Sequence, residues 1–292
     1  KHPLPDSAAS TDPQAAASLH LPKKSNRYWD PEVIQDAKRL PAGPDDFGPD
    51  LYCDFVCDFI RQNREKPFLI YYSMTLIHKH NRQFPDAPDF EHPGRRLPPT
   101  PESSVRYIDH LVGRITETVD RLGLQENTFV LFTSDNGPAD HGKNQTVEQG
   151  VRVPLIVRGP GIAPGAVSSE LVSLVDVYPT LVELSGGALP KDRAIDGVSM
   201  APVWFDRPGK RRDWLFSYQG PNRMLRDKRW LLQGTGEFLD CGENRDGKNY
   251  RNVTNSKSPE VVAARERFAQ ILQQLPAPQL DPSATQRTRK SK

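Results

Sequence analysis

Apolar runs and amphipathic stretches alternate along the first two thirds of the chain, and this order predicts an α/β fold. Residues 67–73 and 128–133 are short continuous apolar runs after polar turns, which is typical of strands buried on both faces. A third run, 153–157, ends at a Gly-Pro-Gly turn. Apolar residues at helical spacing follow Pro49 and Pro101, so helices separate the strands. The order predicts a mostly parallel sheet flanked by helices.

The spacing also predicts how the chain is divided. Residues 1–48 are rich in Pro, Ala and Ser and predict an irregular N-terminal segment, before an α/β domain over 49–210. Residues 211–277 carry short apolar pieces between polar turns, followed by a helical pattern over 258–275. They predict a small C-terminal α+β subdomain with an antiparallel sheet. Residues 278–292 form a polar basic tail.

Composition narrows the class of partner. The 292 residues carry 39 Lys and Arg against 37 Asp and Glu, a net charge of +2. This balance argues against nucleic acid or an anionic membrane surface as the main partner. Hydrophobic residues at 36% and charged residues at 26% are too apolar and too balanced for wholesale disorder. No run approaches the ~18 apolar residues of a membrane span, and the first residues lack the apolar core of a secretory signal.

The three cysteines predict no disulfide framework, because their number is low and odd. Cys53 and Cys57 are one helical turn apart, and Cys241 stands alone. Small apolar side chains in a core are the favoured interpretation over a metal or redox site.

Candidate chemistry gathers after the predicted strands. His78 follows the first strand, Asp135 and Asn136 follow the second, and Lys143 lies in the next loop. Ligands of doubly wound sheets bind beyond the carboxyl ends of the strands, so these side chains are expected at one edge. Carboxylate and amide oxygens suit Ca²⁺ or Mg²⁺. An ordinary Asn-Gly turn, a structural histidine and a solvated lysine stay open as alternatives.

Other histidines have weaker claims: His80, His110 and His141. His110 lies within the second helical pattern, where a structural role is expected.

Several segments together resemble one family. FTSDNGP at 132–138, GKNQTVEQGVRVPLIVRGPG at 142–161 and LVDVYPTLVELSGG at 174–187 are similar to sulfatases, as is YYSMTLIHKH at 71–80. The resemblance is to the formylglycine-dependent arylsulfatase type, in the alkaline-phosphatase-like superfamily. It implies that fold and covers the carboxyl-terminal two thirds of such an enzyme.

The resemblance implies a role for each candidate. Asp135 and Asn136 match calcium ligands, with Mg²⁺ as the other ion considered. Lys143 matches the lysine that contacts the sulfate and its bridging oxygen, five residues before Glu148, and His78 matches the histidine near the leaving oxygen. Lys143 and His78 would therefore be both catalytic and substrate-binding. A cation, an ammonium and an imidazolium would all stabilise the charge of a sulfate monoester transition state.

Two departures and one absence qualify this match. Gln149 stands where the family usually has Gly, and His80 where it usually has Pro. No Cys/Ser-x-Pro-x-Arg motif occurs, so the formylglycine nucleophile is expected outside this chain. The chain is interpreted as a fragment or a truncated homologue.

The resulting hypothesis is a hydrolase of sulfate monoesters, either of small molecules or, more specifically, of carbohydrates. The resemblance implies that such an enzyme is exported to the periplasm, the lysosome or the exterior of the cell. The alternatives are a catalytically inactive remnant that binds or supports, and a phosphate or phosphonate monoester hydrolase, which Asn136 disfavours. The sequence does not specify an oligomeric state. Five arginines are candidates to meet a sulfated or uronic sugar: Arg82, Arg95, Arg96, Arg223 and Arg226.

Overall fold

The computed structural model describes residues 27–79, 83–138, 142–143, 145–244 and 247–275. The chain forms two compact units, Lys1–Thr128 and Phe129–Lys292. The predicted boundary between residues 210 and 211 falls inside the second unit, and the predicted domain division stays a prediction.

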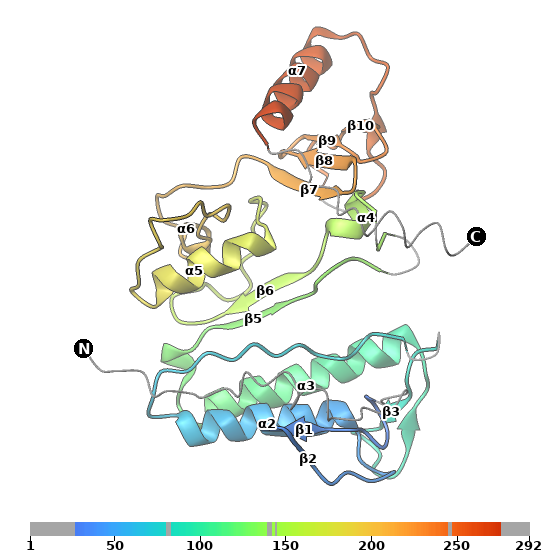
Figure 1. The fold of residues 1–292 in the computed structure, drawn as a ribbon, viewed down its shortest axis with the longest axis vertical. Coiled ribbons are helices and arrows are strands. Elements are labelled where there is room, and N and C mark those ends of the chain that lie inside the picture. Colours follow the sequence, from blue (N-terminus) through green and yellow to red (C-terminus); the bar gives the residue numbers. More distant parts are fainter. Residues whose placement is uncertain (1–26, 80–82, 139–141, 144, 245–246, 276–292) are drawn as a thin grey trace. The chain divides into compact units, whose positions relative to one another are not determined.

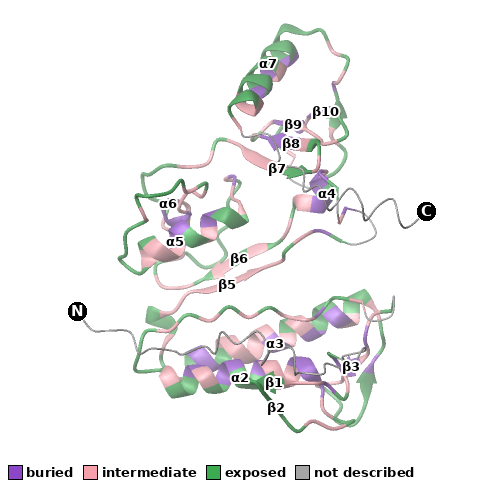
Figure 2. Cartoon of the chain, viewed as in Figure 1, coloured by how far each residue is buried: buried purple, intermediate pink, exposed green. Residues whose placement is uncertain are grey.

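Two long helices form the first unit, as the periodicity predicted (Figure 1). They are α2 (Gly48–Asn63) and α3 (Pro101–Arg121). The hydroxyl of Thr100 accepts a hydrogen bond from the amide of Ser103 at 3.1 Å, which caps α3 at its start. Both helices bury one stripe of side chains and expose the other (Figure 2).

A polar clamp joins these helices beside their apolar contact. The hydroxyl of Tyr107 on α3 donates to both carboxylate oxygens of Asp50 on α2 at 2.8 Å. The guanidinium of Arg114 reaches the same carboxylate at 3.3 Å. Burial raises the pKa of Asp50 in spite of these two partners. The clamp sets which turn of α3 lies against which turn of α2.

Short elements complete the first unit. They are β1 (Ile34–Gln35), β2 (Lys38–Arg39), β3 (Ala87–Pro88), β4 (Arg96–Leu97) and a 3₁₀ helix (Gln125–Asn127). The strands form two antiparallel hairpins. They lie in stretches where the sequence predicted irregular chain and loop.

The predicted strand at 67–73 pairs with no other strand among the described residues. Phe68, Ile70 and Tyr72 pack against the helix cores, whereas Leu69 and Tyr71 are 73% and 91% exposed. The period-2 alternation is therefore real. Within the first unit the helices cover one face of this segment, and burial of its other face stays a prediction.

In the second unit, β5 (Val130–Thr133) pairs with β6 (Leu155–Arg158). The pairing is antiparallel, with Val130 opposite Arg158 and Thr133 opposite Leu155. Every strand pair of the described residues is antiparallel, so the predicted mostly parallel sheet is not formed among them. Apolar periodicity reports burial and carries no information about strand direction.

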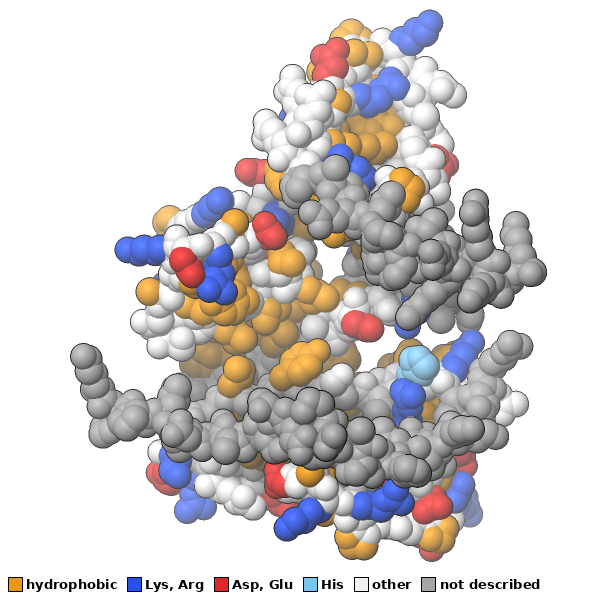
Figure 3. Space-filling model, viewed as in Figure 1, with side chains coloured by type: hydrophobic (Ala, Val, Ile, Leu, Met, Phe, Trp, Pro, Cys, Tyr) orange, Lys and Arg blue, Asp and Glu red, His pale blue; other side chains and the backbone are white. Residues whose placement is uncertain are grey.

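Three short helices belong to the same unit: α4 (Glu148–Val151), α5 (Val177–Leu184) and α6 (Ala201–Trp204). A 3₁₀ turn (Leu174–Asp176) precedes α5. Hydrophobic side chains gather over α5 and the β5–β6 pair (Figure 3). Exposed apolar residues of these elements include Ile156, Val175 and Tyr178.

The C-terminal part is an antiparallel sheet with a helix, as predicted. Its strands are β7 (Leu215–Gln219), β8 (Asn222–Arg226), β9 (Trp230–Leu232), β10 (Phe238–Asp240) and β11 (Arg251–Asn252), in the order β11-β10-β9-β8-β7. Helix α7 (Pro259–Gln274) packs on this sheet, and the ring of Phe268 lies edge-on to that of Phe238 with the ring centroids 5.4 Å apart. None of the helices in the described part of the chain is both long and apolar enough to cross a bilayer.

All three cysteines are buried, as the sequence predicted. Cys53, Cys57 and Cys241 have at most 3% of their surface exposed. Burial raises the pKa of the Cys53 thiol to about 12 and that of Cys241 to about 11. The thiols of Cys53 and Cys241 are therefore protonated at neutral pH, and all three cysteines are core side chains.

Candidate active site

One folded loop carries three of the four predicted functional residues. It leaves β5 at Ser134 and ends at α4. The amide of Gly137 donates to the carbonyl of Gly150 at 3.0 Å, and the amides of Gly142 and Lys143 both donate to the carbonyl of Pro138 at 3.1 Å. These bonds bring the backbone before Lys143 back to the segment that follows Asp135 and Asn136.

Glycine is required at two places where this loop touches α4. A β-carbon at Gly137 would collide with the carbonyl oxygen of Gln149, and one at Gly142 would collide with the backbone of Gln149 and Gly150. The loop can approach α4 this closely only without side chains at these positions. The Asn-Gly pair is therefore part of a packed loop that is fixed on both sides of Lys143.

The side chains of Asp135 and Asn136 offer one carboxylate and one amide oxygen. Asp135 is exposed and Asn136 is half-buried. The amide nitrogen of Asn136 donates to the carbonyl of Gly137 at 3.0 Å, which turns its amide oxygen away from that carbonyl. This donor set fits a hard cation such as Ca²⁺. Two such side chains supply part of a shell of six or more oxygens, so the remaining ligands have to come from other residues or water.

Glu148, five residues after Lys143, is buried and forms an internal ion pair. Its side chain is 8% exposed and forms an ion pair of 2.9 Å with Arg226, whose side chain is 6% exposed. The hydroxyl of Tyr250 lies 3.2 Å from Arg226 and 3.4 Å from Glu148. Arg226 was one of five arginines that the sequence offered as candidates to meet a sugar. It does not fit that role, because its guanidinium is buried and paired inside the protein.

Other arginines on the predicted list also have internal partners. Arg223 donates to the carbonyls of Leu272 and Leu275 at 3.1 and 3.3 Å, so it caps the end of α7. Arg96 pairs with Asp86 at 3.0 Å and lies over the ring of Trp29. Arg95 is exposed and remains a candidate, while Arg82 lies outside the described residues.

His78 lies in the first unit, directly after the extended segment, and is exposed. Its amide donates to the carbonyl of Thr75 at 3.1 Å, and its Nδ1 lies 2.8 Å from the carbonyl of Lys79. When Nδ1 donates to that carbonyl, Nε2 is the ring nitrogen left for proton exchange. The expected common edge of His78 with Asp135, Asn136 and Lys143 stays a prediction, since each unit is described by itself.

Of the three weaker histidine candidates, only His110 lies within the described residues. His110 stacks on Phe90 with ring centroids 4.3 Å apart, which agrees with a structural role. His80 and His141 lie outside the described residues.

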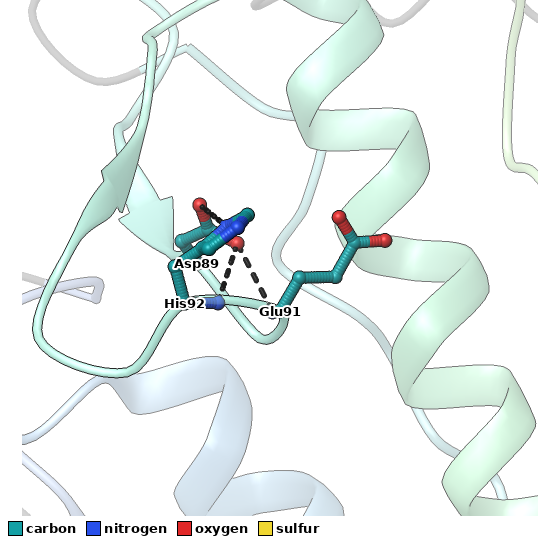
Figure 4. Close-up of side chains that lie close together, drawn as sticks. All are labelled: Asp89, Glu91 and His92. Atoms are coloured by element: carbon teal, nitrogen blue, oxygen red, sulfur yellow. Dashed lines mark hydrogen bonds and ion pairs between the residues drawn. The ribbon is translucent and has the colours of Figure 1, made fainter.

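Three further side chains, which were not among the candidates predicted from the sequence, lie close enough together to share a cation. Asp89, Glu91 and His92 lie in the loop between β3 and β4 (Figure 4). Asp89 accepts hydrogen bonds from the amides of Glu91 and His92 and from the ring of His92 at 3.0 Å. Glu91 is paired with Arg106. Because the acids already have partners in an exposed turn, these contacts lock the turn.

The family model described as Sulfatase matches residues 21–187. Steryl-sulfatase of Mus musculus is 37% identical over 219 residues, which cover 68% of this chain and 34% of that protein. N-acetylgalactosamine-6-sulfatase of Rattus norvegicus is 35% identical over 239 residues, which cover 72% of this chain and 44% of that protein. The chain thus spans less than half the length of these relatives.

Solved structures agree on the fold. The crystal structure of the PsFucS1 sulfatase from Pseudoalteromonas sp. superposes with a TM-score of 0.61 at 22% identity, covering 82% of this chain and 57% of that one. A structure titled Ps i-CgsB gives a TM-score of 0.62 at 20% identity, covering 81% and 57%. At such identities the likeness shows a common α/β fold alone.

Proposed function

Because the chain belongs to the sulfatase family, we propose that it forms the carboxyl-terminal part of a sulfuric ester hydrolase and supplies half of its active site. The observation that carries the proposal is the loop after β5. Its glycine contacts hold a carboxylate, an amide and a lysine in one folded element. An ordinary surface turn that holds no functional side chains does not require such close backbone packing.

In this proposal each side chain has one task. Asp135 and Asn136 would hold a Ca²⁺ ion, which when bound supplies positive charge next to the sulfate oxygens. The ammonium of Lys143 binds the sulfate and its bridging oxygen, where negative charge grows as the S–O bond breaks. The imidazolium of His78 donates a proton to the departing oxygen.

The nucleophile would lie outside this chain. The sequences around Cys53, Cys57 and Cys241 support this. None of the three lies in a Cys-x-Pro-x-Arg motif. This chain alone is therefore expected to bind a sulfate ester and not to hydrolyse it.

The proposed substrate is a sulfate monoester of a small molecule or a carbohydrate. The similar proteins include a steryl-sulfatase and an N-acetylgalactosamine-6-sulfatase. Arg95 is exposed and remains a candidate to contact a sulfated or uronic sugar. Export to the periplasm, the lysosome or the exterior of the cell remains the expected location.

Two other functions compete with this one. A phosphate or phosphonate monoester hydrolase is disfavoured by Asn136, since imidazole in that place would suit smaller or softer metals better. An inactive remnant is disfavoured by the preserved glycine contacts around Asp135 and Lys143.

Calcium binding by this chain tests the proposal. We expect Ca²⁺ at millimolar concentration to raise the melting temperature, and D135N to abolish the rise. Asp192, an exposed carboxylate paired with Arg193 in the same unit, provides the control variant D192N. Equal responses of D135N and D192N would refute the assigned ligand.

Turnover provides the second test. The chain preceded by its own upstream coding sequence, coexpressed with a formylglycine-generating enzyme, is expected to hydrolyse nitrophenyl sulfate. An upstream sequence without Cys/Ser-x-Pro-x-Arg, together with no turnover, would favour the remnant.

A further inference from the structure

A buried charge pair connects the candidate loop to the C-terminal sheet. Glu148 is the first residue of α4, and Arg226 is the last residue of β8, 78 positions later. Tyr250 completes the group with its hydroxyl against both partners. Sulfur Sγ of Cys241 lies 3.5 Å from Arg226 on the remaining side. Burial opposes the charge of Arg226, but Glu148 raises its pKa, so the ion pair persists.

The same sheet holds the residues just before Glu148. The amide of Gly234, in the turn after β9, donates to the carbonyl of Thr146 at 2.8 Å. The side-chain oxygen of Gln233 accepts from the amide of Glu148 at 3.3 Å. A β-carbon at Gly234 would collide with the side chain of Thr146. The segment therefore lies directly on the turn between β9 and β10.

Helix α4 connects the C-terminal sheet to the loop that carries the candidate site. Val151 packs against the apolar group of Met224, Leu231 and Leu239 on the sheet. In the same helix, the carbonyl of Gly150 accepts a hydrogen bond from the amide of Gly137, the residue directly after Asn136. One rigid turn of four residues thus lies between the sheet and the loop.

We propose that Arg226, acting through Glu148, is a positioning residue for Asp135, Asn136 and Lys143. The C-terminal sheet would then be the support on which the cation and sulfate side chains of the active site are aligned. The inference rests on the proposed function for the chemistry of that site. Its structural part, the dependence of the loop on Arg226, stands on the contacts alone.

Stability by itself does not account for this pair. Removing two charges from water costs much of what their attraction returns, so a buried ion pair is weak evidence for a stabilising role. An apolar pair of similar volume would often serve the stability of the core as well. A charged pair does impose one geometry, because its hydrogen bonds allow few alternative arrangements.

Three variants of the complete chain test the proposal: R226M, R226K and Y250F. Arg212 provides the matched control, since it forms another largely buried ion pair of this unit, with Asp176, and its Nε lies 3.0 Å from that carboxylate. R212M removes the arginine partner of a buried carboxylate just as R226M does. Among the described residues, however, the Asp176 carboxylate also accepts from the amides of Ser173 and Val198, which lie outside the loop after β5.

The first readout is hydrogen exchange of the Gly137 and Lys143 amides, measured by NMR. We expect exchange to accelerate in R226M and partly in Y250F, to recover toward the wild-type rate in R226K, and to stay unchanged in R212M. The second readout is the affinity for Ca²⁺ itself, where loss of a supporting residue is expected to weaken binding about tenfold. If R226M does not fold, Y250F and R226K carry the comparison, because they change a single hydroxyl or preserve the charge.

The outcomes separate the two ideas. Unchanged exchange at Gly137 and Lys143 in a folded R226M or Y250F would overturn the positioning role, and so would equal acceleration in R212M. Accelerated exchange specific to the Arg226 and Tyr250 variants, without Ca²⁺ binding by the wild type, would uphold the positioning role while the proposed metal function fails.

Discussion

The hydroxyl of Tyr28 donates a hydrogen bond to the backbone carbonyl of His78, 50 residues further along the chain. The same hydroxyl reaches the carbonyl of Thr75 at 3.0 Å, so it spans the turn that carries the histidine. Tyr28 is 2% exposed and stacks on Phe47 with centroids 6.1 Å apart. A residue of the core thus fixes the backbone of an exposed imidazole, and burial raises the pKa of the tyrosine to about 12.

The variant Y28F tests this arrangement. Loss of one buried hydroxyl that serves two carbonyls is expected to lower the free energy of unfolding by about 1 kcal/mol. The amide of His78 should exchange faster, because its turn loses its external support. Urea denaturation and NMR exchange measure the two effects. Tyr72, whose hydroxyl donates to the carbonyl of Pro49 at 3.3 Å, provides the control Y72F. Equal changes at His78 in both variants would argue against a specific role of Tyr28.

The helices could be predicted because their signals are local. Apolar side chains at three- and four-residue spacing gave α2 and α3, and the proline at position 101 marked where α3 begins. The antiparallel C-terminal sheet followed from short apolar pieces between turns. Strand direction at β6 was missed, since an apolar run in a sheet reads the same whichever way its neighbour runs.

The candidate site was only partly readable. Asp135, Asn136 and Lys143 were predicted to belong together, and the loop after β5 does join them through Pro138 and two glycines. The ion pair of Glu148 with Arg226 was missed because its partners are 78 residues apart. The signal that could have found it is an arginine directly after the apolar Met224 and Leu225, at a position that the strand buries.

Burial of the thiols predicts their reactivity. Cys53, Cys57 and Cys241 are expected to react slowly with Ellman's reagent in the native protein at neutral pH, and completely after unfolding in guanidinium. The reason is twofold: their surfaces are covered, and burial raises the pKa of Cys53 and Cys241 well above neutral. One thiol that reacts within seconds in the native state would contradict this and would reopen a redox or catalytic role.

Acid should weaken the C-terminal sheet through Asp240. Hydrogen bonds from Arg229, and then from Arg251, lower the pKa of this carboxyl from 3.8 to about 2. A lowered folded-state pKa contributes stability above the unfolded value, and this contribution is lost as the pH falls from about 4 to about 2. The amide of D240N cannot ionise. We therefore expect the difference in urea midpoint between the wild type and D240N to be large at neutral pH and to shrink below pH ~4. A constant difference would show that the carboxylate charge is not its source.

The closeness of the loop to α4 gives the sharpest test of the candidate site. In G142A the new methyl group would collide with the backbone of Gln149 and Gly150. We expect a loss of about 1–3 kcal/mol in the free energy of unfolding, as for overpacked cores. The displaced loop should also lose the Ca²⁺-dependent rise in melting temperature.

Gly113 provides the opposite control, because it lies in the interior of α3 with open space where a methyl would stand. There alanine is the better helix former, so G113A should raise the free energy of unfolding by about 0.5–1 kcal/mol and leave Ca²⁺ binding as it is. If G142A proved as harmless as G113A, the loop would be free to move away from α4. The glycine contacts could then no longer be the reason that Asp135, Asn136 and Lys143 are held together.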